Sequence, residues 1–173
     1  TPVSVCDVIT SIAGPREGEA LFDPFAGWGG LLLSVARGEI PSLARLSGNE
    51  LNPGAHAIAT KLLSLSGVDA TLELTDSAAT PWPMTDVLIS VPPFGVSLQE
   101  AVDLPFGRVR ELDIASIAWA AQSLTPGGRA VLLTPRGWTF RSGASAKLRS
   151  WLRSNFHVSA LIGLEAVSGG TSI

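Results

Sequence analysis

A stiff hook of two prolines and an aromatic ring is the feature of this sequence best suited to chemistry. It reads VPPFG from Val91 to Gly95 and follows the apolar, strand-like run at residues 86–89. Proline fixes its own φ and pushes the residue before it into an extended conformation. Such a hook can hold one ring and a row of backbone carbonyls in place, which suits a planar group that carries an amine.

A glycine-rich turn, DPFAGWGG from Asp23 to Gly30, follows an expected strand and leads into an expected helix. Its glycines let the backbone approach a ligand closely, and the first N–H groups of the helix are unpaired donors. The pattern suits a nucleotide-like cofactor or, equally simply, a tight strand-to-helix turn. It is not a dinucleotide fingerprint, because Leu32 stands where the third glycine belongs, and it lacks the Gly-Lys-Ser/Thr of a Walker loop.

Two carboxylates end further expected strands. Glu50 comes about twenty residues after the glycines, where an acid would reach the two hydroxyls of a ribose. It could instead be a solvated carboxylate that caps the helix beginning at Pro53. Asp76, in TDSAATPWP, could accept a hydrogen bond from an adenine amino group, or could be an ordinary turn residue.

The elements that position these residues alternate between strand and helix. This order predicts an α/β fold with a doubly wound, mostly parallel sheet and helices on both faces. The expected helices cover residues 3–13, 29–37, 53–66, 113–124 and 142–154, and the expected strands residues 20–23, 45–51, 70–75, 87–90, 129–134 and 158–162. Ligands of such a sheet bind at the carboxyl ends of its strands, where the turn, both acids and the hook fall.

Composition indicates one globular domain over residues 1–173, because 46% of the residues are hydrophobic and 16% are charged. The single Cys6 excludes an internal disulfide, and His56 and His157 lack nearby metal-ligating partners, so we expect no metal and a reducing, cytoplasmic setting. No apolar run is long enough to cross a membrane. The abrupt ends, GGTSI among them, suggest a fragment of a longer protein that lacks its last strand.

The net charge of −3 is unevenly distributed along the chain. Residues 1–100 carry a balance of −7 and residues 101–173 a balance of +4. A cluster of basic residues in the second part could face a polyanion or could be a solvated helix face. Its members are Arg136, Arg141, Lys147, Arg149 and Arg153.

The motifs and their order resemble those of class I adenosylmethionine-dependent methyltransferases, and among them the N6-adenine DNA methyltransferases. The closest likeness is to the modification subunits of type I restriction systems, and it spans essentially the whole chain. It rests on DPFAGWGGLL, NELNPGAHAIA, TDS, VPPFG and the later TPGGRAVLLTPRGWTFRSGASAKLRSWL. The resemblance implies a Rossmann-like fold without its last strand, with target recognition supplied by a region absent here.

The resemblance also implies roles for individual residues. S-adenosyl-L-methionine would be the cofactor, and DNA the substrate, its target adenine flipped out of the stack. A specificity or restriction subunit would be a further partner, and no membrane is involved. The cofactor would lie against Thr1, Pro2, Asp23, Phe25, Gly27, Gly29, Glu50 and Asp76. The catalytic hook would be Val91, Pro92, Pro93 and Phe94.

One position of the hook departs from the family pattern. Val91 stands where the family has Asn, Asp or Ser, and valine has no side-chain hydrogen-bonding group. Strand alternation directs the neighbouring Ser90 to the opposite face. The sequence therefore leaves three hypotheses: an adenine methyltransferase with reduced or full turnover, a catalytically impaired module of the same fold that binds DNA or a partner subunit, and a small-molecule or protein methyltransferase.

Overall fold

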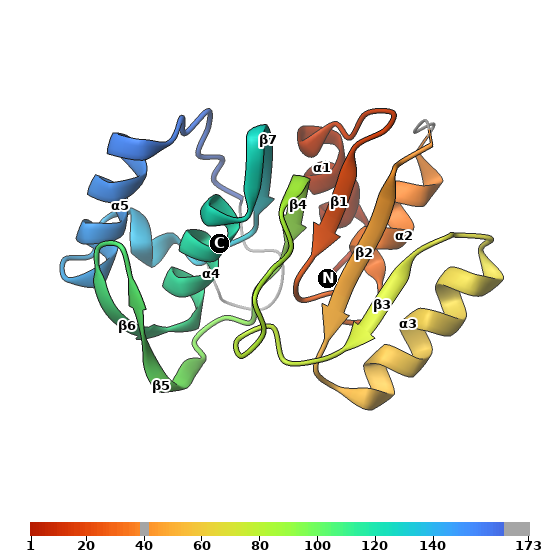
Figure 1. The fold of residues 1–173 in the computed structure, drawn as a ribbon, viewed down its shortest axis with the longest axis horizontal. Helices are drawn as coiled ribbons and strands as arrows, with labels where there is room; N and C mark the ends of the chain where they lie inside the picture. The colour runs from red at the N-terminus through yellow and green to blue at the C-terminus, as the bar shows by residue number, and fades with distance from the viewer. Residues whose placement is uncertain (39–41, 165–173) are drawn as a thin grey trace. The chain divides into compact units, whose positions relative to one another are not determined.

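A five-stranded parallel sheet forms the first of two units into which the chain divides (Figure 1). The computed structural model describes residues 1–38 and 42–164. The first unit holds residues 1–91 and 122–132, and the second holds residues 92–121 and 133–173. The prediction of one domain over residues 1–173 is not tested by this division and stays a prediction.

The sheet has the strand order β3-β2-β1-β4-β7, and every neighbouring pair is parallel. The central strands are buried on both faces, as parallel strands usually are: Val87, Leu88 and Ile89 of β4 are 0% exposed. The strands are β1 (Ala20–Asp23), β2 (Arg45–Glu50), β3 (Thr71–Leu74), β4 (Thr85–Ser90) and β7 (Leu124–Leu132). This sheet confirms the predicted Rossmann-like α/β class.

Three helices of the first unit contact one another in turn, so they cover one face of the sheet. They are α1 (Val3–Ala13), α2 (Gly30–Arg37) and α3 (Pro53–Leu65). The helix α3 begins where predicted because the Asn52 side chain accepts hydrogen bonds from the N–H groups of Gly54 and Ala55, and because Pro53 suits the first helical position. Coverage of the second face would involve the other unit and stays a prediction.

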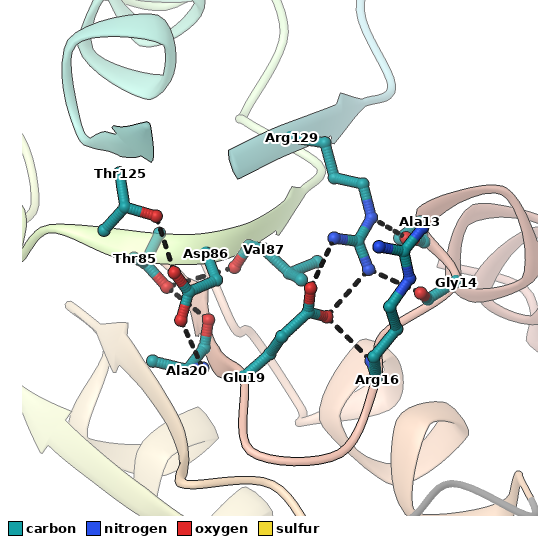
Figure 2. A network of polar contacts seen from close by, with 10 residues as sticks. All are labelled: Ala13, Gly14, Arg16, Glu19, Ala20, Thr85, Asp86, Val87, Thr125 and Arg129. Carbon is teal, nitrogen blue, oxygen red and sulfur yellow. Dashed lines mark hydrogen bonds and ion pairs between the residues drawn. The ribbon is translucent and has the colours of Figure 1, made fainter. Parts of the chain in front are cut away.

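A network of charged groups fastens the amino ends of the strands (Figure 2). Arg129 of β7 donates to both carboxylate oxygens of Glu19, at 2.8 Å each, and to the carbonyls of Ala13 and Gly14 at the carboxyl end of α1. Asp86 of β4 accepts from the N–H of Ala20 at 2.9 Å and from the Thr125 hydroxyl at 2.5 Å. These contacts tie α1, β1, β4 and β7 together.

The TPGG segment, residues 125–128, explains how Thr125 reaches Asp86. The pairing of β4 with β7 skips between Thr85 and Val87, where the β7 strand bulges. A Cβ on Gly128 would lie 2.9 Å from the carbonyl oxygen of Thr125 and 3.1 Å from that of Asp86, so only glycine fits there. The strand β7 consequently begins at Leu124, five residues before the strand predicted at 129–134.

In its described residues, the second unit contains a hairpin, two α-helices and a short 3-10 helix. The antiparallel strands β5 (Ser97–Leu104) and β6 (Gly107–Glu111) are followed by α4 (Leu112–Gln122), whose last residue belongs to the first unit, and by the short 3-10 helix η1 (Arg136–Thr139) and α5 (Ala144–Asn155). Trp151 of α5 contacts the rings of Phe106 and Phe156 at 5.5 and 5.0 Å. This aromatic cluster joins α5 to the hairpin.

The expected strand at residues 158–162 is wrong, because residues 157–164 form no regular element. Val158, Leu161 and Ile162 are 44–65% exposed and have no neighbouring strand in the described residues. A β-rich composition alone does not form a strand without a partner. The GGTSI segment lies outside the described residues. Within the described ranges, no helix has the length and apolarity needed to cross a bilayer.

Candidate functional site

The glycine-rich turn is the first component of the site, and two of its glycines have backbones that favour glycine. Gly27 and Gly29 have φ values of +57° and +78°, in the left-handed region. A Cβ on Gly29 would lie 3.3 Å from Cβ of Ala59 in α3, whereas a Cβ on Gly27 would meet nothing within 4 Å. Gly29 is thus required for helix packing, while Gly27 leaves open space beside the backbone.

Glu50 binds this turn directly at the carboxyl end of β2. One carboxylate oxygen accepts from the N–H of Gly27 at 2.8 Å, and the other accepts from the N–H of Asn52 at 2.7 Å. The first contact places Glu50 against the glycine turn. The second does not cap α3, because Asn52 itself is the cap residue and its own side chain accepts from the first N–H groups of the helix. The role of Glu50 toward a ribose stays a prediction. Each oxygen keeps a further lone pair for another donor.

Asp23 is fully buried at the end of β1. Its Oδ1 accepts from the N–H of Phe25 at 3.1 Å, but Oδ2 has no hydrogen-bond partner in the described structure. Burial raises the pKa of Asp23 to about 7, and the nearby Glu50 charge adds to the rise against the lowering effect of the Phe25 N–H. A buried carboxylate with a free oxygen favours a positively charged ligand.

Asp76 and its loop are fixed by a relay that sequence reasoning missed. Asn49 of β2 donates from Nδ2 to the Ser77 hydroxyl at 3.0 Å, and that hydroxyl donates to the carbonyl of Pro24 at 2.5 Å. Both side chains are about 5% exposed or less. Asp76 accepts locally from the N–H of Ala78 at 2.8 Å. The relay therefore joins three strand ends: those of β1, β2 and β3.

Trp82 packs beneath the same loop. Its Nε1 donates to the carbonyl of Ser77 at 2.8 Å, and its ring lies edge-on to those of Phe22 and Phe25, with centroids 6.2 and 5.8 Å away. This packing positions the predicted cofactor residue Phe25. Trp28, also in the turn, is instead 64% exposed. The signal for this relay in the sequence was weak, because Asn, Ser and Trp in a loop suit many roles.

The remaining cofactor residues expected from the sequence, Thr1 and Pro2, are exposed and precede α1. The carbonyl of Pro2 accepts from the N–H groups of Val5 and Cys6, which starts the helix. The structure thus brings Asp23, Phe25, Gly27, Glu50 and the Asp76 loop together at the carboxyl end of one sheet. Among the described residues, no hydrogen bond or ion pair places Thr1 beside them, so its role stays a prediction.

The hook spans the boundary between the two units. Val91 is half-buried and is the last residue of this segment in the first unit, whereas Pro92, Pro93 and Phe94 begin the second. Pro92 is buried, Pro93 is exposed, and Gly95 has a φ of +70°. The Ser90 hydroxyl is fully buried with no hydrogen-bond partner among the described residues, so it lies away from solvent. That it faces the opposite side of the strand from Val91 stays a prediction.

Two hollows in the described part of the chain lie away from the carboxyl ends of the strands. One, of about 510 Å³, is lined by α1 and α2 residues that include Asp7, Ser34 and Arg37. The other, of about 340 Å³, lies between α3 and the start of β3. Neither contains a residue predicted to bind the cofactor or to catalyse a reaction.

Comparison with known proteins gives the site its context. The methylase subunit of the EcoEI type I restriction enzyme from Escherichia coli is 21% identical over 184 residues, which cover 95% of this chain and 38% of that protein. The type I restriction-modification methyltransferase subunit from Streptococcus thermophilus superposes with a TM-score of 0.79 at 24% identity, covering 89% of this chain and 38% of that one. The M protein of EcoKI gives 0.76 at 20% identity, covering 88% and 37%.

These solved structures share the fold of the chain, which is the class I methyltransferase fold. The sequence model of the N-6 DNA methylase family matches residues 1–167, nearly the whole chain. By that match, this chain belongs to the N-6 DNA methylase family.

Proposed function

We propose that this chain is a catalytic domain that transfers a methyl group from S-adenosyl-L-methionine to N6 of adenine in DNA. Membership of the N-6 DNA methylase family supports the reaction class. The observation that carries the proposal is the set of residues at the carboxyl end of the sheet. There the buried Asp23 has an oxygen without a partner, Gly27 has open space beside its backbone, and Glu50 accepts from the Gly27 N–H. The chain spans 38% of the length of the EcoEI methylase subunit. The activity of the whole protein is therefore proposed here as well.

The residues at this end of the sheet fit adenosylmethionine chemically. The free Oδ2 of Asp23 is suited to a cationic donor, and Gly27 leaves space for a ligand beside its backbone. The spare lone pairs of Glu50 suit ribose hydroxyls, and Asp76 suits an adenine amino group. Phe25, held by Trp82, would contribute apolar contact, and Thr1 and Pro2 would border the methionine portion.

The hook would hold and activate the target base. Adenosylmethionine supplies a methyl group on a positively charged sulfur. The exocyclic amine of adenine is a weak nucleophile because its lone pair is delocalised into the ring. The Pro92 carbonyl would accept a hydrogen bond from that amine and localise the lone pair, while Phe94 would stack on the base and Pro93 would keep the hook rigid.

A second candidate function is a catalytically impaired module that binds DNA or a partner subunit. The observation that favours it is Val91, which offers no hydrogen bond where the family has an oxygen, together with the buried Ser90 hydroxyl, which is not exposed to replace it. Loss of one preorganised partner costs about 3 kcal/mol in the barrier, or roughly a hundredfold in rate. Cofactor binding would survive that loss.

Calorimetry with adenosylhomocysteine tests the cofactor site. We expect binding by the parent chain and a loss of about tenfold or more in Glu50→Gln, since the neutral amide binds ribose hydroxyls less well. Glu73→Gln, an exposed change on β3, is the matched control and should bind like the parent. A folded parent that binds no adenosylhomocysteine would overturn the methyl-transfer proposal and the retained cofactor site of the second candidate.

Methyl transfer separates the two candidates. We expect recognition of the DNA site to lie outside this chain, in further regions or in a specificity subunit, so the assay restores those regions. Labelled methyl groups incorporated into duplex DNA are identified as N6-methyladenine after digestion. Val91→Asn should raise the rate about a hundredfold. Transfer by the Val91→Asn form alone supports the impaired module, and equal rates would contradict the importance of Val91.

A further inference from the structure

A cationic segment of the second unit has no part in the chemistry described above. Residues 133–157 contain Arg136, Arg141, Lys147, Arg149 and Arg153 but no aspartate or glutamate. All of these except Arg149 are exposed. None of the exposed four forms an ion pair with a carboxylate in the described parts of the chain. Unpaired positive charge on an otherwise acidic protein favours a polyanionic partner.

Arg149 has a different role, which is to order the loop at residues 133–143, hereafter the β7–α5 loop. Its Nη1 donates to the carbonyl of Trp138 at 2.5 Å and to that of Arg141 at 2.9 Å. The indole of Trp138 donates to the Thr134 hydroxyl at 2.8 Å. The loop is therefore held by Arg149 of α5 and by the contact of Trp138 with Thr134.

The β7–α5 loop presents an aromatic ring between two cations. Phe140 is 67% exposed, although burial of a phenylalanine ring is favourable in free energy. Arg136 and Arg141 lie on either side of it in the sequence. The Arg141 guanidinium lies over Gly137. A Cβ on Gly137 would be 2.8 Å from Cζ of Arg141.

We propose that the β7–α5 loop is a nucleic-acid contact, in which Phe140 stacks on an unstacked base and Arg136 and Arg141 bind the flanking phosphates. Single-stranded and flipped-out bases are recognised by this combination of an aromatic ring and guanidinium groups. An acidic protein surface would satisfy the cations but gives no reason for the exposed ring. The choice of DNA as the nucleic acid rests on the proposed function.

The phosphate contacts are tested by the salt dependence of DNA binding. The dissociation constant of the full chain is measured for a mixed-sequence duplex between low and moderate salt. We expect Arg136→Gln and Arg141→Gln each to reduce the slope of log affinity against log salt by about 1. Arg16→Gln removes an exposed arginine from the first unit and should leave the slope unchanged. Equal effects of all three changes would overturn the phosphate contacts.

The stacking contact is tested with three DNAs of one sequence: the duplex, the duplex with one bulged adenine, and the single strand. Phe140→Ala should weaken binding of the bulged and single-stranded DNAs about tenfold, with little change for the plain duplex and none in the salt slope. Phe140→Trp should restore binding. Leu161→Ala, at a residue of nearly equal exposure (65%), should bind all three like the parent. Unchanged binding in Phe140→Ala would overturn the stacking role.

These outcomes are independent of methyl transfer. Loop-dependent DNA binding without any N6-methyladenine would leave the inference intact and contradict the proposed reaction. If the chain methylates adenine but its loop variants bind DNA like the parent, the proposed reaction stands and the inference about the loop is contradicted. A parent chain that binds none of the DNAs at low salt, or that prefers an acidic peptide, would overturn the inference.

Discussion

The acids at the two ends of the parallel sheet differ in burial and in hydrogen bonding: Asp23 at the carboxyl end is buried, whereas Glu19 and Asp86 at the amino end are partly exposed. At the amino end, Glu19 and Asp86 accept hydrogen bonds at both carboxylate oxygens. The Arg129 guanidinium lowers the pKa of Glu19, and the Ala20 N–H and Thr125 hydroxyl lower that of Asp86. At the carboxyl end, burial raises the pKa of Asp23 to about 7, and one of its oxygens has no described partner.

This difference indicates what each end is for. The amino-end carboxylates are satisfied within the fold, so they stabilise it whether or not a ligand is present. The ionised Asp23 carboxylate instead destabilises the ligand-free fold, and a cation placed beside it would remove that cost. Among the described residues, the buried carboxylate oxygen without a partner lies at the carboxyl end of β1, which is where ligands of this sheet type bind.

The largest loss of stability is expected when the contacts of Arg129 at the amino end of the sheet are removed. Arg129→Met would leave the Glu19 carboxylate and the carbonyls of Ala13 and Gly14 without their donors. We expect a loss of about 3 kcal/mol in the free energy of unfolding, measured in urea. Arg45→Met is the matched control, since Arg45 donates a single exposed hydrogen bond to Met84, and should cost less than about 1 kcal/mol. Equal losses would mean that the network adds little.

The second prediction concerns Asp23 and pH. A folded-state pKa raised above the unfolded value means that stability is full below about pH 4 and falls as the pH rises towards about 7. Asp23→Asn removes this fall. At pH 8 we expect the variant to be more stable than the parent by about 2 kcal/mol, less than the full shift implies because the new amide also lacks a partner. Unfolding curves from pH 4 to pH 8 give the measurement.

The amino end supplies the internal control for that experiment. The lowered pKa values of Glu19 and Asp86 mean that their stabilisation is present above about pH 4 and is lost as the pH falls further. This acid-side loss should be the same in the parent and in Asp23→Asn. A variant that differs from the parent equally at pH 4 and pH 8 would show that Asp23 is not the titrating group.

Much of this contrast could be anticipated from the sequence, because strand ends are marked by local patterns. The run ALFDPFAG predicts a strand followed by a glycine turn, and β1 ends at Asp23 as expected. The acids at Glu50 and in the Asp76 loop also lie where the alternating pattern put them. The predicted roles of these residues and of the hook stay predictions.

The contacts between strand ends could not be anticipated, since they depend on register. The Asn49–Ser77–Pro24 relay joins residues up to 53 positions apart, and no local pattern specifies such a pairing. The hairpin of β5 and β6 was missed because its strands carry charged residues, Asp103 and Arg108 among them, that obscure alternation. The Arg129 network depends on the β7 bulge, which the TPGG motif marks but does not describe.

The third prediction compares how much the polar contacts at the carboxyl end of the sheet stabilise the fold with the contribution of those at the amino end. Ser77→Ala removes the acceptor of the Asn49 amide and the donor to the Pro24 carbonyl. We expect a loss of about 1–2 kcal/mol in the free energy of unfolding, because both groups are buried. Ser47→Ala, which removes one longer bond of 3.3 Å to the Leu21 carbonyl, should cost clearly less.

The smallest loss of stability is expected for Trp82→Phe, which separates the hydrogen bond of Trp82 from its apolar contacts. Trp82→Phe removes the Nε1 donor to the Ser77 carbonyl but keeps an aromatic ring against Phe22 and Phe25. We expect a loss of about 1 kcal/mol by urea unfolding, since one hydrogen bond is lost while most of the apolar contact remains. Trp28→Phe, at an exposed position in the same turn, should change nothing. A cost well above that of Ser77→Ala would mean that aromatic packing, more than the polar relay, holds the carboxyl end in place.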